Sequence, residues 1–130
     1  MALSTDETSF SSDVLESYVP VLVNFWAPWC GLCRIIEPLL QSFQNEWGGQ
    51  VRVVGINADE NLKLTNFYRL KTLPTLLLIH QGQLVRRIDS FRGRDDLRQT
   101  LDAIMRSPDI YEYWAAHGQI PILPNLLPQE

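Results

Sequence analysis

Hydrophobic residues in this chain occur either in short continuous runs or at the spacing of an amphipathic helix. The runs at residues 21–27, 51–57 and 73–80 consist mainly of aliphatic and aromatic side chains, which is typical of buried β-strands. A fourth apolar segment, residues 84–88, follows the third run after a glycine-containing turn, and the two predict a β-hairpin. We therefore expect a sheet that contains these four strands, to which residues 1–3 could add only a short edge strand.

Four stretches have apolar residues at helical spacing, with candidate caps at their ends. The longest stretch ends at Gly48-Gly49, a common helix terminus, and Pro38 inside it predicts a kink. The succession of strand, helix and strand over residues 21–57 favours parallel pairing through a right-handed crossover. The expected helices span about residues 9–18, 31–47, 59–68 and 94–106.

The segment Trp29-Cys30-Gly31-Leu32-Cys33 stands where the first long strand gives way to the longest helix. Cys30 is therefore expected at the helix N-terminus, where free backbone N–H groups and the helix dipole stabilise an anion and favour the thiolate. Cys33 follows one turn later on the same face, within reach of a mixed disulfide formed on Cys30. This spacing predicts dithiol–disulfide chemistry.

Two other interpretations of the cysteine pair carry less weight. A tetrahedral zinc site needs four ligands, and beyond the two cysteines the chain offers only His80 and His117, which lack ligand-like spacing. A structural disulfide across so short a loop would restrict the unfolded chain very little. We therefore expect no metal site.

The overall composition fits one globular domain that contacts neither nucleic acid nor a membrane. The chain has 130 residues, 45% of them hydrophobic and 20% charged, which suffices for a single core. Its net charge of −4 argues against a nucleic-acid surface, and no apolar run reaches membrane-spanning length. Because the acidic N-terminus lacks the features of a signal peptide, we expect a reducing cytosol. A transit peptide removed from a longer precursor would instead place the chain in an organellar stroma.

The composition changes after Ser107. Residues 109–118 could form one more helix, and residues 119–130 combine prolines with Ile and Leu, which favours an extended segment. We expect a domain over residues 1–107 and a C-terminal extension over residues 108–130. The extension is apolar enough to pack back on the domain, to cover a partner surface or to mediate self-association.

Two motifs resemble the thioredoxin family. Residues 25–33, FWAPWCGLC, resemble its active-site block, and residues 73–78, LPTLLL, resemble its second signature, in which the proline is cis. Pro38 matches the family's helix-kinking proline, and the similarity covers about residues 4–106. The resemblance implies an α/β thioredoxin fold, with a central mixed five-stranded sheet in the order 1-3-2-4-5, an antiparallel last hairpin and four helices on both faces. It also implies that Pro74 lies against the cysteine pair.

The resemblance implies catalysis by dithiol–disulfide exchange. Cys30 attacks a target disulfide, Cys33 resolves the mixed disulfide, and the pair itself is the redox centre, with no bound cofactor. A reductase linked to NADPH, ferredoxin or glutathione then restores the dithiol. Trp26 is expected to be mainly a core residue. The resemblance also implies an apolar substrate surface made of Trp29, Gly31, Thr72, Leu73 and Pro74.

Two departures from the family's pattern adjoin the second cysteine and the cis-proline. Leu32 replaces the proline that precedes the second cysteine; it frees the helix start and adds a backbone donor, which should favour the Cys30 thiolate and make the disulfide a stronger oxidant. Asp89 and Ser90 replace a usual Val-Gly beside the cis-proline. Ser90 thereby joins the candidate substrate surface, and Asp89 should disfavour acidic peptides.

A third departure lies beneath the cysteines. Asn24 stands where the family has a buried Asp that accepts the proton of the second cysteine, and Gly55 stands where a Lys often partners that Asp. An amide cannot act as a base near neutral pH. We therefore expect Cys33 to lose its proton slowly, with the help of water or of the leaving thiolate.

Together these features predict an atypical member of the thioredoxin family: a monomeric, cytoplasmic protein-disulfide reductase. Its expected partners are protein disulfides and a thioredoxin reductase, linked to NADPH or ferredoxin. Two alternatives on the same fold stay open, an oxidase- or isomerase-like protein and a non-enzymatic interaction module. The two cysteines argue against the module, because a binding scaffold has no physical need for them.

Overall fold

The apolar runs of the chain pair into a mixed β-sheet. β2 (Val21–Trp26) runs parallel to β3 (Arg52–Asn57) on one side and antiparallel to β4 (Thr75–His80) on the other. β5 (Gln83–Ile88) pairs antiparallel with β4, so the four long strands follow the order β3-β2-β4-β5. The two-residue β1 (Leu3–Ser4) runs parallel to β3 at its outer edge. The predicted mixed sheet, its parallel crossover and its hairpin are confirmed.

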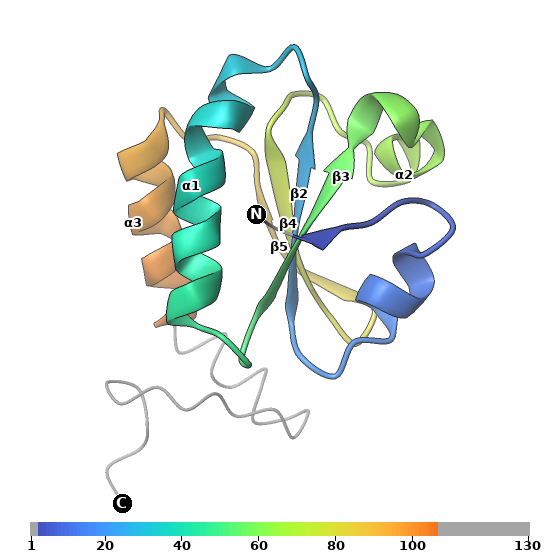
Figure 1. Cartoon of the computed structure of the whole chain (residues 1–130), viewed down its shortest axis with the longest axis horizontal. Helices are drawn as coiled ribbons and strands as arrows, with labels where there is room; N and C mark the ends of the chain where they lie inside the picture. The colour runs from blue at the N-terminus through green and yellow to red at the C-terminus, as the bar shows by residue number, and fades with distance from the viewer. Residues whose placement is uncertain (1–2, 107–130) are drawn as a thin grey trace, which may run out of the picture. The chain divides into compact units, whose positions relative to one another are not determined.

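The two faces of this sheet bury different helical segments (Figure 1). The buried face of β2 that carries Phe25 packs with η1 (Ser11–Leu15) and with Leu64 of α2 (Leu62–Phe67). α1 (Gly31–Glu46) covers the opposite face. Because side chains alternate along a strand, the second face receives every other residue of β2, which includes Asn24 and Trp26. The buried residues of α1 are Cys33, Ile36, Leu39, Leu40 and Phe43.

Two predicted helices differ from the observed ones. The helix expected over residues 59–68 is interrupted: a 3₁₀ turn, η2 (Ala58–Glu60), precedes α2. Asn61 separates the two elements with non-helical φ −137°, and its side chain donates to the carbonyl of Asn57 at 2.9 Å. Such side-chain bonds to the backbone compete with the helix. The segment expected over residues 9–18 is shorter, because η1 is a π-helix of 5 residues.

Glu7 joins the N-terminal segment to α2. Its Oε2 accepts the backbone N–H of Lys63 at 2.7 Å and that of Leu64 at 3.3 Å, and its own N–H donates to Asn61 Oδ1 at 2.9 Å. The first N–H groups of a helix have no partner within the helix, and a carboxylate there also interacts favourably with the helix dipole. Glu7 therefore serves as the cap of a helix that follows it by 55 residues in the chain.

The structure, a computed structural model, describes residues 3–106, and a second compact unit begins at Arg92. Its described part holds α3 (Arg94–Met105), the helix predicted at residues 94–106, whose apolar stripe is buried as expected. Arg92 N–H donates to Asp96 Oδ2 at 2.8 Å at the start of this helix. The extension predicted over residues 108–130 lies outside the described residues. Within residues 3–106, no helix combines the length and the apolar character needed to span a membrane.

Candidate active site

The turn between β2 and α1 places Cys30 at the start of the helix. After β2 ends at Trp26, the N–H of Cys30 donates to the carbonyl of Ala27 at 3.1 Å and closes a tight turn. Cys30 is in extended conformation, with φ −89° and ψ 107°, and is the N-cap residue of α1. Gly31 is the first residue of the helix and is exposed. The predicted position of Cys30 at a strand-to-helix junction is confirmed.

Cys30 and Cys33 are joined by a disulfide, with their Cα atoms 5.3 Å apart. The backbone N–H of Cys33 donates to Cys30 Sγ at 3.2 Å, which is the place that a Ser or Asp oxygen takes in an ordinary N-cap. Both side chains are buried, with 6% and 5% of their surface exposed. They form a small apolar cluster with Ala27, against which Trp26, Leu32 and Leu73 pack.

The cis bond expected before Pro74 is confirmed, since the Leu73–Pro74 peptide is cis. Pro74 is buried directly before β4, and Leu73 packs against the cysteine cluster. Thr72 is exposed, and its carbonyl accepts the hydroxyl of Thr75 at 2.7 Å, which holds the turn before the strand. This segment therefore brings Leu73 to the cysteine pair from a distant part of the sequence.

Trp29 is 67% exposed, yet its indole is held by a hydrogen bond. Nε1 donates to Asp59 Oδ2 at 2.9 Å, across to η2. Asp59 was not among the predicted site residues. Its position was a usable signal, because β2 and β3 are parallel and residues that follow their carboxyl ends meet at the same edge of the sheet.

The other residues considered in the sequence differ in their relation to the cysteine pair. Leu32 is half-buried against the cysteine cluster. Ser90 is exposed beyond the end of β5, and its hydroxyl donates to Asp89 at 3.4 Å, so its membership of a substrate surface stays a prediction. Of the two histidines weighed as zinc ligands, His80 is buried in β4 and His117 lies outside the described residues. Among residues 3–106 no three His, Cys, Asp or Glu side chains are grouped to hold a metal ion.

Asn24 and Gly55 are direct neighbours in the sheet, in β2 and β3. Asn24 is 1% exposed, and its Oδ1 accepts no hydrogen bond from the described residues. A Cβ added to Gly55 would lie 3.2 Å from Nε1 of Trp26. The indole therefore occupies space that a larger residue at position 55 would need, and the described residues place no ionic pair at this position.

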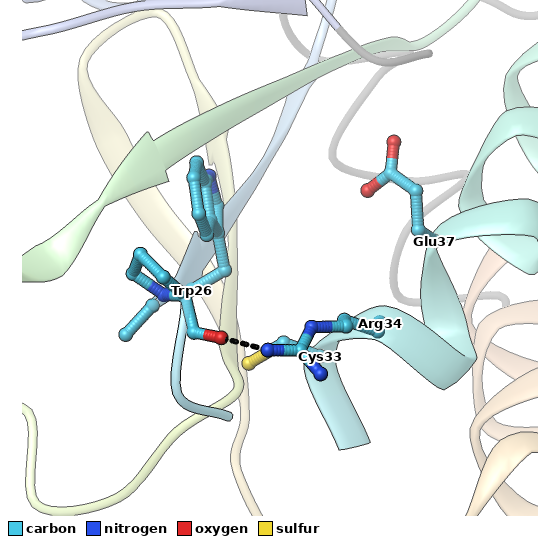
Figure 2. Close-up of a pocket in the computed structure, with 6 residues that line it drawn as sticks. Trp26, Cys33, Arg34 and Glu37 are labelled. Atoms are coloured by element: carbon cyan, nitrogen blue, oxygen red, sulfur yellow. Dashed lines mark hydrogen bonds between the residues drawn. The ribbon is translucent and has the colours of Figure 1, made fainter. Parts of the chain in front are cut away.

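A pocket of about 190 Å³ opens beside Cys33, between α1 and the turn that follows β2 (Figure 2). Arg34 donates from its guanidinium to the carbonyl of Pro28 on the pocket wall. Glu37 is half-buried and also lines the pocket, from the same helix as Cys33. Neither Arg34 nor Glu37 was predicted as a site residue. Cys33 and Glu37 are four residues apart, however, and this spacing puts these two side chains on one helix face. The lining residues are Trp26, Ala27, Pro28, Cys33, Arg34 and Glu37.

Comparison with known proteins agrees with this geometry. The family model described as Thioredoxin matches residues 1–103. The chain is 38% identical over 102 residues to Thioredoxin 1 of Synechococcus elongatus, an alignment that covers 78% of this chain and 95% of that protein. It is 40% identical over 96 residues to the thioredoxin of Synechocystis sp., with 74% of this chain and 90% of that protein covered.

Proposed function

This chain belongs to the thioredoxin family and is a thiol–disulfide oxidoreductase that acts through Cys30 and Cys33, and from this premise we propose that Cys30 attacks and Cys33 resolves. The observation that carries the assignment is the hydrogen bond from the Cys33 N–H to Cys30 Sγ at 3.2 Å. The same N–H and the positive end of the α1 dipole stabilise negative charge on Cys30 in the reduced protein. Cys33 is the third residue of α1 and so lies further from the positive end of the dipole.

In the proposed reaction the Cys30 thiolate bonds to one sulfur of a target disulfide, and the second target sulfur leaves as a thiolate. Cys33 then loses its proton and bonds to Cys30 Sγ, which breaks the bond between Cys30 and the target. The target leaves fully reduced, and the protein is left with the Cys30–Cys33 disulfide. Two electrons pass to the target in each turnover. The pair itself serves as the redox group, without a further cofactor.

An extended peptide is the substrate that the surface around Cys30 fits best. Leu73 packs on the cysteine cluster, and the exposed indole of Trp29 is held in place by Asp59. Apolar side chains beside a reactive sulfur stabilise a bound peptide by burying its surface. The proposed contact residues are Trp29, Gly31, Thr72, Leu73, Pro74 and Ser90.

The thioredoxin family takes protein disulfides as substrates and a thioredoxin reductase as its electron donor. For this chain we propose a reductase linked to NADPH or ferredoxin, and a monomer that works in the cytoplasm or in an organellar stroma. A reducing compartment suits the proposal, because the dithiol has to be regenerated after each turnover.

An oxidase- or isomerase-like role is the second candidate, and Leu32 is the observation that favours it. Leu32 packs against the cysteine cluster at the second position of α1, where a proline would fix φ and remove an N–H. Added stabilisation of the Cys30 thiolate favours the reduced form and makes the disulfide a stronger oxidant.

Reductase-coupled reduction of insulin tests the main proposal. The native chain should reduce insulin, and the Cys30→Ser variant should be inactive. Cys33→Ser should instead accumulate a mixed disulfide through Cys30. Alkylation of the reduced protein across a pH series should show one thiol that reacts at pH values well below about 8.5, the ordinary pKa of a thiol. Mixed-disulfide formation through Cys33 in Cys30→Ser would contradict the assignment of the two roles.

A further inference from the structure

At the position where the thioredoxin family has a buried acid, this chain has Asn24. Asn24 is buried there, and an amide does not accept a proton from a thiol near neutral pH. Its sheet neighbour Gly55 has no side chain, and the indole of Trp26 fills the adjoining space. Any group that takes the proton of Cys33 has to reach the sulfur from another direction.

The pocket beside Cys33 supplies such a direction. Cys33 and Glu37 both line it and are one turn apart on α1, which puts their Cβ atoms about 6 Å apart. The pocket volume of about 190 Å³ is well above what one water molecule requires. Figure 2 shows the Glu37 side chain extending from α1 on the pocket side of the helix. Both residues therefore border one cavity large enough for several water molecules, through which a proton can pass from Cys33 to the carboxylate.

The remaining walls of the pocket offer no competing base. Trp26, Ala27 and Pro28, from β2 and the turn after it, carry no group that titrates near neutral pH. Arg34 is the other charged residue of the wall, and its guanidinium is engaged by the carbonyl of Pro28. A guanidinium does not act as a base and can only stabilise negative charge nearby. Glu37 is the one carboxylate among the described residues that line the pocket.

We propose that Glu37 accepts the proton of Cys33 through pocket water during the resolving step, in place of the acid that Asn24 has replaced. The inference rests on the proposed roles of Cys30 and Cys33. Cys33 Sγ bonds to Cys30 Sγ, the bond from Cys30 to the target sulfur breaks, and the target sulfur leaves with the electron pair. The proton of Cys33 passes through water to the Glu37 carboxylate and from there to solvent. When a reductase opens the disulfide, the same route returns the proton to Cys33.

A reaction with one equivalent of an aromatic disulfide, 5,5′-dithiobis(2-nitrobenzoate), separates the two steps. The first coloured thiolate reports the attack by Cys30, and the second reports resolution by Cys33. In Glu37→Gln the first phase should keep its rate, and the second phase should slow by at least about tenfold. General-base catalysis typically contributes about a hundredfold or more, so an effect of this size is well within its range. Glu37→Asp should recover most of the second rate.

The pH profile distinguishes proton transfer from a structural role. The second phase of the native protein should depend weakly on pH, whereas in Glu37→Gln it should rise steeply towards the thiol pKa of about 8.5. Glu46→Gln, the same change on the same helix but away from the pocket, is the matched control and should leave both phases unchanged.

Three results would overturn the inference: a second phase in Glu37→Gln that matches the native protein at every pH, equal slowing in Glu46→Gln, or slowing that does not vary with pH and is not recovered by Glu37→Asp. Failure of the first phase in the native protein would instead contradict the proposed role of Cys30. The two failures therefore have different readouts.

Discussion

The indole of Trp29 and the carboxylate of Asp59 are joined by a hydrogen bond of 2.9 Å. The bond ties the residue before Cys30 to the turn after β3 and fixes an exposed aromatic ring beside the reactive sulfur. We expect Asp59→Ala to raise KM for insulin about fivefold, with kcat nearly unchanged, because the indole is no longer held in place. A fivefold change corresponds to roughly 1 kcal/mol of binding free energy. Steady-state insulin reduction measures both constants. Glu60→Ala, in the same turn, is the control, and a fall in kcat at constant KM would refute the expectation.

Leu32→Pro should lower the reduction potential of the Cys30–Cys33 pair. Proline removes one N–H at the start of α1 and so weakens the stabilisation of the Cys30 thiolate. A change of about 30 mV corresponds to about 1.4 kcal/mol and is readily measured by equilibration with glutathione buffers. Leu32→Ala removes the packing on the cysteine cluster but keeps the N–H, and its potential should stay close to that of the native protein. Equal potentials for the native protein and Leu32→Pro would contradict this account.

Asn24→Asp should speed turnover above neutral pH, because it restores a carboxylate at the position where the family has its buried acid. The gain should be larger in the Glu37→Gln background, where the pocket route is missing. Burial raises the pKa of a carboxyl group, so the variant should also lose stability as the pH rises above the unfolded value of about 3.9. Aromatic-disulfide kinetics and urea unfolding measure the two effects. An unchanged second phase in the double variant would count against the role assigned to the carboxylate.

Asp6 provides a test of stability against pH. Hydrogen bonds, chiefly from the Thr8 hydroxyl and then from the Ser9 backbone, hold the pKa of Asp6 below its usual value. Because the folded pKa is lowered, the stabilisation is present above the unfolded value of about 3.9 and is lost as the pH falls through the folded one. Asp6→Asn keeps the acceptor oxygen but removes the charge. Urea unfolding should show a less stable variant at neutral pH and a difference that disappears in acid; a difference that is constant with pH would be the contrary result.

Most of the sheet could be predicted because its signal is local. β2 and β3 consist mainly of apolar residues, and the structure has them within one residue of the predicted ends. The interruption before α2 was missed, since it depends on the side chain of Asn61, which bonds both to Asn57 and to the distant Glu7. Hydrophobic periodicity carries no information on such contacts.

The candidate site divides in the same way. Cys30, Cys33 and the cis-proline stand in contiguous motifs, so their types and spacing were readable. Asp59 and the pocket at Glu37 depend on how separate elements meet, which a single sequence shows only indirectly. The absence of an acid at position 24 was visible in the sequence. The role of the carboxylate of Glu37, one turn after Cys33, could be inferred only from the structure, in which Cys33 and Glu37 line one cavity.

The cap that Glu7 provides has a practical consequence for anyone who shortens or tags this protein. Removal of the first seven residues would leave the amides of Lys63 and Leu64 to water and would also delete the edge strand beside β3. The destabilised element would be α2, which is distant in sequence and follows the turn that contains Asp59. Expression tags therefore belong ahead of an intact N-terminal segment, and a trimmed version with weak activity would report a loosened helix rather than a faulty redox centre.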